Sequence, residues 1–230
     1  MKITAIARAQ SVYAMPPSIF ATVPVFDLVD GLKARYGFRH IPTGQELINP
    51  PPNQPTNFLW GKCHIGGRTI TVESLQVQNY AALATSVSVT TRTSTDDSDL
   101  VLADLQQWVV ADFKVNAKQV FPTNYVSQLE FIVDRPISEQ LMILKPLAEL
   151  VTGLVRGYGF TACPDYEPSS FILFFDNSKF TNPPTFAGSF LVDRRAGAGY
   201  EENRYYSQAP LRTADHIALL NELEKLLMKK

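Results

Sequence analysis

Few side chains in this 230-residue sequence have the type and spacing that catalysis or metal binding requires. The histidines are His40, His64 and His216, and the cysteines are Cys63 and Cys163. Cys63 and His64 are neighbours on a predicted strand, so their side chains point to opposite faces and cannot bind one ion together. We place the other two histidines at surface positions beside helix ends. The sequence therefore predicts no metal site and no cofactor.

Carboxylates give a weak indication of an active site. The acidic run at residues 96–99 opens a predicted helix, where carboxylates cap free N–H groups and favour the helix dipole. Asp165 and Glu167 lie in a predicted loop, and with that run they are the candidate acids of a hydrolase-type site between the two halves of the chain. Neither a nucleophile elbow nor a phosphate-binding loop occurs. An enzyme is therefore an alternative rather than the favoured class.

The most distinctive polar cluster lies on two predicted strands, at residues 190–195 and 204–208, around a glycine-containing tip. Strand alternation would place its arginine and tyrosine side chains together on one face, a composition common in binding surfaces. Cross-strand ion pairing on a solvated face is the alternative interpretation. The candidate binding residues are Arg194, Arg195, Tyr200, Arg204, Tyr205 and Tyr206.

The framework that must position these side chains contains a segment that occurs twice. Residues 24–38 reappear as residues 146–160, 122 positions later (146 minus 24), without a gap. Each copy spaces its apolar residues along one face of a helix and ends in Tyr-Gly-Phe. Glycine at that position is the usual helix terminator. We expect a helix in each copy, with both apolar stripes buried against their own sheets.

Both halves have the order strand, helix, loop, three strands, helix. The sequence therefore predicts an α+β fold formed by tandem duplication, with residues 1–117 and 118–230 as two closely packed repeats about a pseudo-two-fold axis. Each repeat should form an antiparallel sheet with helices packed on one face. The uniformly apolar segment Phe171–Phe175 is predicted to be the most deeply buried strand.

The composition is that of a folded protein rather than a disordered chain, with 45% hydrophobic and 19% charged residues. The net charge is −1, and neither half has an excess of basic residues that would attract nucleic acid or an anionic membrane. The N-terminal apolar stretch is too short for a signal peptide, and no stretch is long enough to span a bilayer. We therefore expect a soluble, cytoplasmic protein.

These observations favour a non-catalytic binding or assembly protein that acts through its loops, including the proline-rich residues 49–55, and through the Arg/Tyr hairpin. A protein partner or a second copy of the chain is expected, because a duplicated chain offers related surfaces for symmetric association. The order of elements also resembles the saddle of the TATA-binding protein, which implies a nucleic-acid-binding alternative. The near-neutral charge does not favour that alternative.

Overall fold

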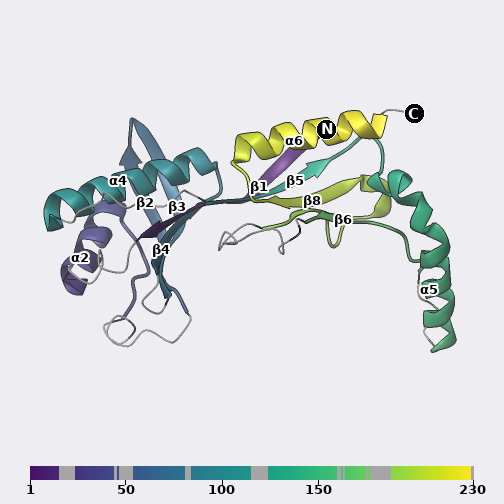
Figure 1. The fold of residues 1–230 in the computed structure, drawn as a ribbon, viewed down its shortest axis with the longest axis horizontal. Helices are drawn as coiled ribbons and strands as arrows, with labels where there is room; N and C mark the ends of the chain where they lie inside the picture. Colours follow the sequence, from purple (N-terminus) through teal and green to yellow (C-terminus); the bar gives the residue numbers. More distant parts are fainter. Residues whose placement is uncertain are drawn as a thin grey trace.

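The computed structural model describes residues 1–15, 24–43, 46, 54–80, 84–114, 124–159, 162, 164–174, 176 and 188–228. Within them, one antiparallel sheet has the strand order β2-β3-β4-β1-β5-β8-β7-β6 (Figure 1). The strands are β1 (Lys2–Met15), β2 (Thr56–Ile65), β3 (Arg68–Tyr80), β4 (Ala84–Thr91), β5 (Asn124–Ile132), β6 (Phe171–Leu173), β7 (Phe190–Arg194) and β8 (Arg204–Ala209). The helices are α2 (Val25–Tyr36), α4 (Thr95–Phe113), α5 (Lys145–Gly157) and α6 (Thr213–Met228), with the 3-10 turns η1 (Ile137–Leu144) and η3 (Tyr200–Glu202).

Strand β1 makes the sheet continuous. Its residues Ala9–Met15 pair with β4, and its residues Lys2–Val12 pair with β5, both antiparallel. The predicted α+β class with antiparallel strands is confirmed. The prediction of a separate sheet in each half is wrong, because β1 and β5 are hydrogen-bonded to each other in the middle of a single sheet.

The apolar core lies on the face of the sheet that carries α4 and α6 (Figure 1). It consists of two clusters of buried side chains. In one, α2 and α4 pack on β2, β3 and β4, with Tyr36 and Phe58 among the largest buried residues. In the other, α6 and η1 pack on β5, β7 and β8, with Phe131 and Tyr205 at the centre. Burial of these alternate strand residues is what the sequence periodicity predicts.

Small hydroxyl side chains fill the seam between the two clusters. The N-termini of α4 and α6 meet there, and each caps the other. The Thr95 N–H donates to Thr213 Oγ1 at 3.1 Å, and the Thr213 N–H donates to Thr95 Oγ1 at 3.0 Å. Ser98 Oγ donates to the Ala9 carbonyl of β1 at 2.9 Å, which fastens α4 to the central strand. The two threonine bonds satisfy backbone N–H donors that helix formation leaves free.

The first copy of the repeated segment forms a helix as predicted. Helix α2 ends at Gly37, which has a left-handed φ of 59° and donates its N–H to the Lys33 carbonyl at 2.9 Å. Phe38 then folds back into the core, where its ring centroid lies 5.6 Å from that of Phe58. Val29, Leu32 and Tyr36 are buried, so the apolar stripe of this copy packs on its own sheet.

The second copy, α5, is also helical, but its stripe is not buried. Thr152 is the one buried residue of α5, whereas Leu150 and Tyr158 are 60% and 75% exposed. The prediction that both stripes pack on their own sheets is therefore wrong for this copy. The cause is visible in Figure 1, where α5 continues from η1 at the end of the molecule and projects away from the sheet instead of folding over it.

The segment predicted to be the most buried strand is instead at the edge of the sheet. Strand β6 has one neighbour, β7, and its residues Ile172 and Leu173 are 61% and 60% exposed. An uninterrupted apolar run indicates a strand covered on both faces, but β6 has no such cover among the described residues. Other predicted features, the prolines at 50–52, Phe160, Cys163 and the loop at 177–187, lie outside the described residues.

His216 was expected at the surface but is fully buried at the start of α6. Its Nε2 lies 2.9 Å from Ser207 Oγ, and its ring packs edge-on against Phe190 with centroids 6.0 Å apart. Burial disfavours the charged imidazolium and lowers the pKa of His216 from 6.5 to about 4. The folded protein therefore holds this histidine neutral where the unfolded chain would protonate it.

We expect the free energy of unfolding to fall as the pH is lowered from about 6.5 to about 4, by about 3 kcal/mol from His216 alone. The unfolded chain binds a proton in this window and the folded protein does not. The stability that His216 contributes is therefore fully present above pH 6.5. Urea unfolding across the window should show a shallower pH slope for His216→Gln, by up to one proton. Parallel slopes for the two proteins would contradict the assignment.

Candidate functional site

The hairpin of β7 and β8 carries the residues predicted to bind a partner. Its tip turns at Gly197, where φ is 82°, and is held by Glu202, whose Oε1 accepts from the Gly199 N–H at 2.7 Å. The guanidinium of Arg194 lies 3.8 Å above the ring of Tyr200 and donates to the Gly199 carbonyl at 2.8 Å. Arg194 and Tyr200 thus hold the tip together.

The predicted Arg/Tyr face is divided between the two sides of the sheet. Tyr205 points into the core, stacks on Phe131 at 5.9 Å and accepts the Ile137 N–H at 2.9 Å. Arg204 and Tyr206, its neighbours in the strand, point to the opposite, open face, because strand side chains alternate. The prediction of a single face with all six residues is wrong, since Tyr205 is a core residue.

Glu130 organises the polar residues of the open face. It lies on β5, is 9% exposed, and binds Arg195 Nε at 3.0 Å through Oε1 and Arg204 Nη2 at 2.9 Å through Oε2. Tyr206 pairs with it in register across β5 and β8. Burial raises the pKa of Tyr206, although Arg8 and Arg195 nearby act in the opposite direction. Sequence reasoning missed Glu130, which strand alternation could have placed on the same face of the sheet as Arg204.

The open face, so called because no described helix packs on it, continues with polar side chains across the centre of the sheet, where Gln10 and Thr90 are buried. Arg8 of β1 donates to Gln10 Oε1 at 2.8 Å, and Gln128 Nε2 donates to Gln208 Oε1 at 2.7 Å. Arg92 binds Glu73 at 2.6 Å at the far side. Among the described residues of this face, basic side chains outnumber acidic ones. The basic residues include Lys2, Arg8, Lys62, Arg92, Arg195 and Arg204, and the acidic ones include Glu73, Glu130 and Asp193.

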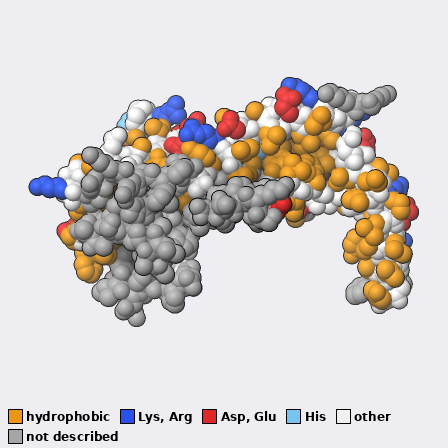
Figure 2. All heavy atoms as spheres, in the orientation of Figure 1, with side chains coloured by type: hydrophobic (Ala, Val, Ile, Leu, Met, Phe, Trp, Pro, Cys, Tyr) orange, Lys and Arg blue, Asp and Glu red, His pale blue; other side chains and the backbone are white. Residues whose placement is uncertain are grey.

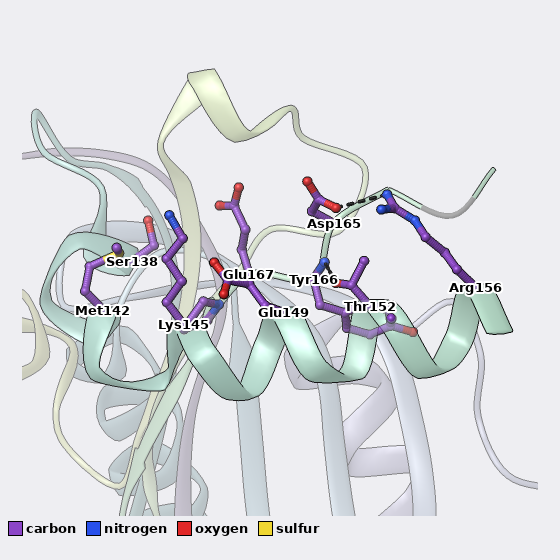
Figure 3. A pocket seen from close by; sticks show the side chains of 11 residues that line it. Ser138, Met142, Lys145, Glu149, Thr152, Arg156, Asp165, Tyr166 and Glu167 are labelled. Carbon is purple, nitrogen blue, oxygen red and sulfur yellow. Dashed lines mark hydrogen bonds and ion pairs between the residues drawn. The ribbon is translucent and has the colours of Figure 1, made fainter. Parts of the chain in front are cut away.

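A cavity of about 530 Å³ lies between α5 and the returning segment 164–168 (Figure 3). Thr152 joins its two walls, since Thr152 Oγ1 accepts the Tyr166 N–H at 2.9 Å. Arg156 binds Asp165 at 2.9 Å at one end. The candidate acids Asp165 and Glu167 therefore share a cavity, but all of its described lining residues fall within 138–168, in the second half of the chain.

The third candidate group of acids has a structural role. Asp96 and Asp99, in the first turns of α4, lie 3.8 Å and 3.3 Å from the guanidinium of Arg212, just before α6.

Among the described residues, no three His, Cys, Asp or Glu side chains lie close enough together to hold a metal ion. Cys63 and His64 point to opposite faces as predicted: Cys63 is in the core, where burial raises the pKa of its thiol to about 11.

An uncovered apolar surface lies on the outer side of η1 and α5, and we call it the α5 face. It shows as a column of hydrophobic atoms on the projecting helix in Figure 2. Sequence reasoning identified the stripe as apolar but placed it in the core. The exposed residues of the α5 face are Ile143, Leu144, Leu147, Leu150, Leu154 and Tyr158.

Comparison with known proteins assigns no relative: no protein family, no curated protein and no solved structure matches the chain. Within the described residues, no helix has the length and apolar character needed to cross a membrane.

We expect Glu130→Gln to lower the free energy of unfolding by about 1 to 2 kcal/mol, because it leaves two half-exposed arginines without their shared carboxylate. Urea denaturation measures the change. Asp165→Asn removes a more exposed ion pair and should change stability by less than about 0.5 kcal/mol. Equal effects of the two substitutions would show that Glu130 does not organise the open face.

Proposed function

We propose that this protein is a non-catalytic assembly protein that binds another protein through the α5 face. The observation that carries the proposal is the exposure of Leu147, Leu150, Leu154 and Tyr158 along one side of a projecting helix. A contiguous apolar surface on a folded domain usually marks an interaction site, whereas single exposed apolar residues need no explanation.

The lack of packing on the apolar side of α5 supports this proposal. A 13-residue helix is marginal in water by itself, and most helices in proteins are stabilised by packing of their apolar face. Helix α5 keeps that face in solvent and is tied to the chain on its other side by Thr152 and Arg156. A partner that covers the α5 face would supply the packing that the helix lacks.

The hairpin of β7 and β8 provides a polar rim beside this apolar surface. Tyr205 accepts the backbone N–H of Ile137, so the hairpin abuts η1, which leads directly into α5. Arg195 and Arg204 of the same region of the sheet are half-exposed on its opposite face, where both bind Glu130. An apolar centre with a polar, arginine-containing rim is the usual anatomy of a protein interface. We place this assembly in the cytoplasm, where the free thiol of Cys63 would stay reduced.

We also propose that the chain arose by the duplication predicted from its sequence. The first four strands have the order β2-β3-β4-β1, and the last four have the order β5-β8-β7-β6, which is the same order reversed about the β1–β5 junction. Thr95 and Thr213 cap each other across that junction. We infer that residues 1–117 and 118–230 descend from one ancestral unit, and that α5 has kept the amphipathic sequence of α2 for a contact outside its own half.

A photo-reactive residue at position 150 should cross-link the protein to a partner in its native cells, because Leu150 lies in the middle of the α5 face. The same residue at Thr69, an exposed position on the β2–β3 hairpin, is the control and should give no adduct. Gel electrophoresis of the adducts provides the readout. Absence of any adduct at position 150 in intact cells would refute assembly through this face.

The open face of the sheet favours a second candidate, binding of single-stranded nucleic acid. Its arginines, glutamines and Tyr206 are suited to phosphates and bases, despite the net charge of −1. A mobility shift of single-stranded DNA should then weaken with salt. Arg8→Gln and Arg204→Gln should each reduce the salt slope by about 0.7, the value for one phosphate contact, while Arg156→Gln should not. No shift at low salt would exclude this candidate.

A further inference from the structure

The first half of the chain shows how a helix with this repeated sequence is covered. Gly31 of α2 lies directly against α4: a Cβ atom at Gly31 would be 2.2 Å from the ring of Trp108, so only glycine allows the contact. Asp104 of α4 accepts from the Tyr36 hydroxyl at 2.7 Å and from Arg35 at 2.6 and 2.7 Å. A glycine, a tyrosine hydroxyl and a leucine stripe thus join α2 to α4.

The surface of α6 resembles the surface of α4 that binds α2, but no helix among the described residues packs on α6. The reciprocal caps align Thr213 with Thr95, 118 positions apart (213 minus 95). At this spacing the buried residues Leu102 and Val109 of α4 correspond to the buried residues Leu220 and Leu227 of α6. The same spacing places Glu222 at the position of Asp104 and Leu226 at that of Trp108.

Both of these corresponding positions are uncovered on α6. Leu226 is 59% exposed, and the Glu222 carboxylate, itself largely exposed, binds Lys225 of the same helix at 2.6 Å. The face of α6 that would receive a helix therefore carries the carboxylate and the apolar side chain that α4 uses to hold α2.

Helix α5 repeats the surface of α2 without a helix under it. The 122-residue spacing of the repeat places Gly153 at Gly31, Leu154 at Leu32 and Tyr158 at Tyr36. A Cβ atom at Gly153 would meet no heavy atom within 4 Å. Leu32 and Tyr36 are buried, whereas Leu154 and Tyr158 are 51% and 75% exposed. The second half thus contains α5 and α6, which correspond to α2 and α4, but α5 does not pack on α6 within the chain.

We propose that α5 of one copy of this chain packs on α6 of a second copy, as α2 packs on α4 within each copy. This inference rests on the proposed assembly function and identifies the partner. Tyr158 would donate to Glu222 of the second copy, and Leu226 would lie against Gly153. Both surfaces are present on every chain, so a two-fold dimer makes the contact twice and closes without free ends.

The structure favours a second copy over closure of α5 onto its own α6. Helix α5 follows η1 without an intervening loop, with Leu144 and Lys145 both in helical conformation. Its inner side is tied to the returning segment by the Thr152–Tyr166 hydrogen bond and the Arg156–Asp165 ion pair. Figure 1 shows α5 directed away from α6.

Two substitutions test the contact from its two sides. Gly153→Leu fills the position that should receive Leu226, at the rim of the cavity beside residues 164–168, and a Cβ atom there has free space around it in the single chain. Leu226→Glu places a charge on α6 at a site that is mostly solvent-exposed. The wild-type chain should sediment at twice its mass of 25.6 kDa. Each variant should raise the dimer dissociation constant about 1000-fold, because it weakens each of the two contacts about 30-fold and the two factors multiply.

A mixture of the two variants distinguishes this pairing from others. Gly153→Leu keeps an intact α6, and Leu226→Glu keeps an intact α5, so the mixed dimer regains one of its two contacts and should form where neither variant alone does. Thr69→Leu, at an exposed position on the β2–β3 hairpin of the other half, is the control and should remain dimeric. A dimer that survives Leu226→Glu would overturn α5–α6 pairing.

The outcome for the wild-type chain separates this inference from the proposed function. A chain that sediments as a monomer at the highest concentration it tolerates refutes self-association. If the cross-link at position 150 then joins a different protein, assembly through the α5 face stands and the identity of the partner proposed here is wrong. Circular dichroism of each variant verifies that a lost dimer is not a lost fold.

Discussion

The backbone pairing of β1 with β5 is the constraint on which the rest of this structure depends. It runs from Lys2↔Ile132 to Val12↔Asn124 and joins two groups of four strands into one sheet. Because strand side chains alternate, one continuous sheet has one apolar face for the helices and one polar face that carries no described helix. The helix-side core and the arginine-containing open face both follow from this arrangement.

The seam above that pairing determines where the helices go. Thr95 and Thr213 cap each other, so α4 and α6 start at the same place and diverge over the two halves of the sheet. Hydroxyl groups suit the seam because the first turn of each helix has free N–H groups that apolar residues could not satisfy. The apolar contacts are then displaced to either side, which explains why the core forms two clusters.

The two ends of the molecule differ in how these helices are covered, and this difference underlies the proposed function. At one end α2 packs on α4 with Gly31 against Trp108; at the other, α5 projects from the sheet and Gly153 contacts nothing. The fold of the single chain does not require the exposed leucines of α5, because they contact none of its core. Apolar residues that do not serve the fold are best explained by an intermolecular contact.

The sequence by itself determined the local structure and the fold class. Glycine after an apolar stripe ended α2 at Gly37, the Gly66-Gly67 pair joined β2 to β3, and the paired strands around residues 196–199 were found where expected. Only the tertiary structure decided which apolar or polar surface is covered. Residues 24–38 and 146–160 have the same amphipathic pattern, yet one stripe is buried and the other exposed. His216, Tyr205 and β6 were misplaced for the same reason. Periodicity defines a face of a helix or strand, whereas burial depends on which distant element, or which second chain, lies against that face.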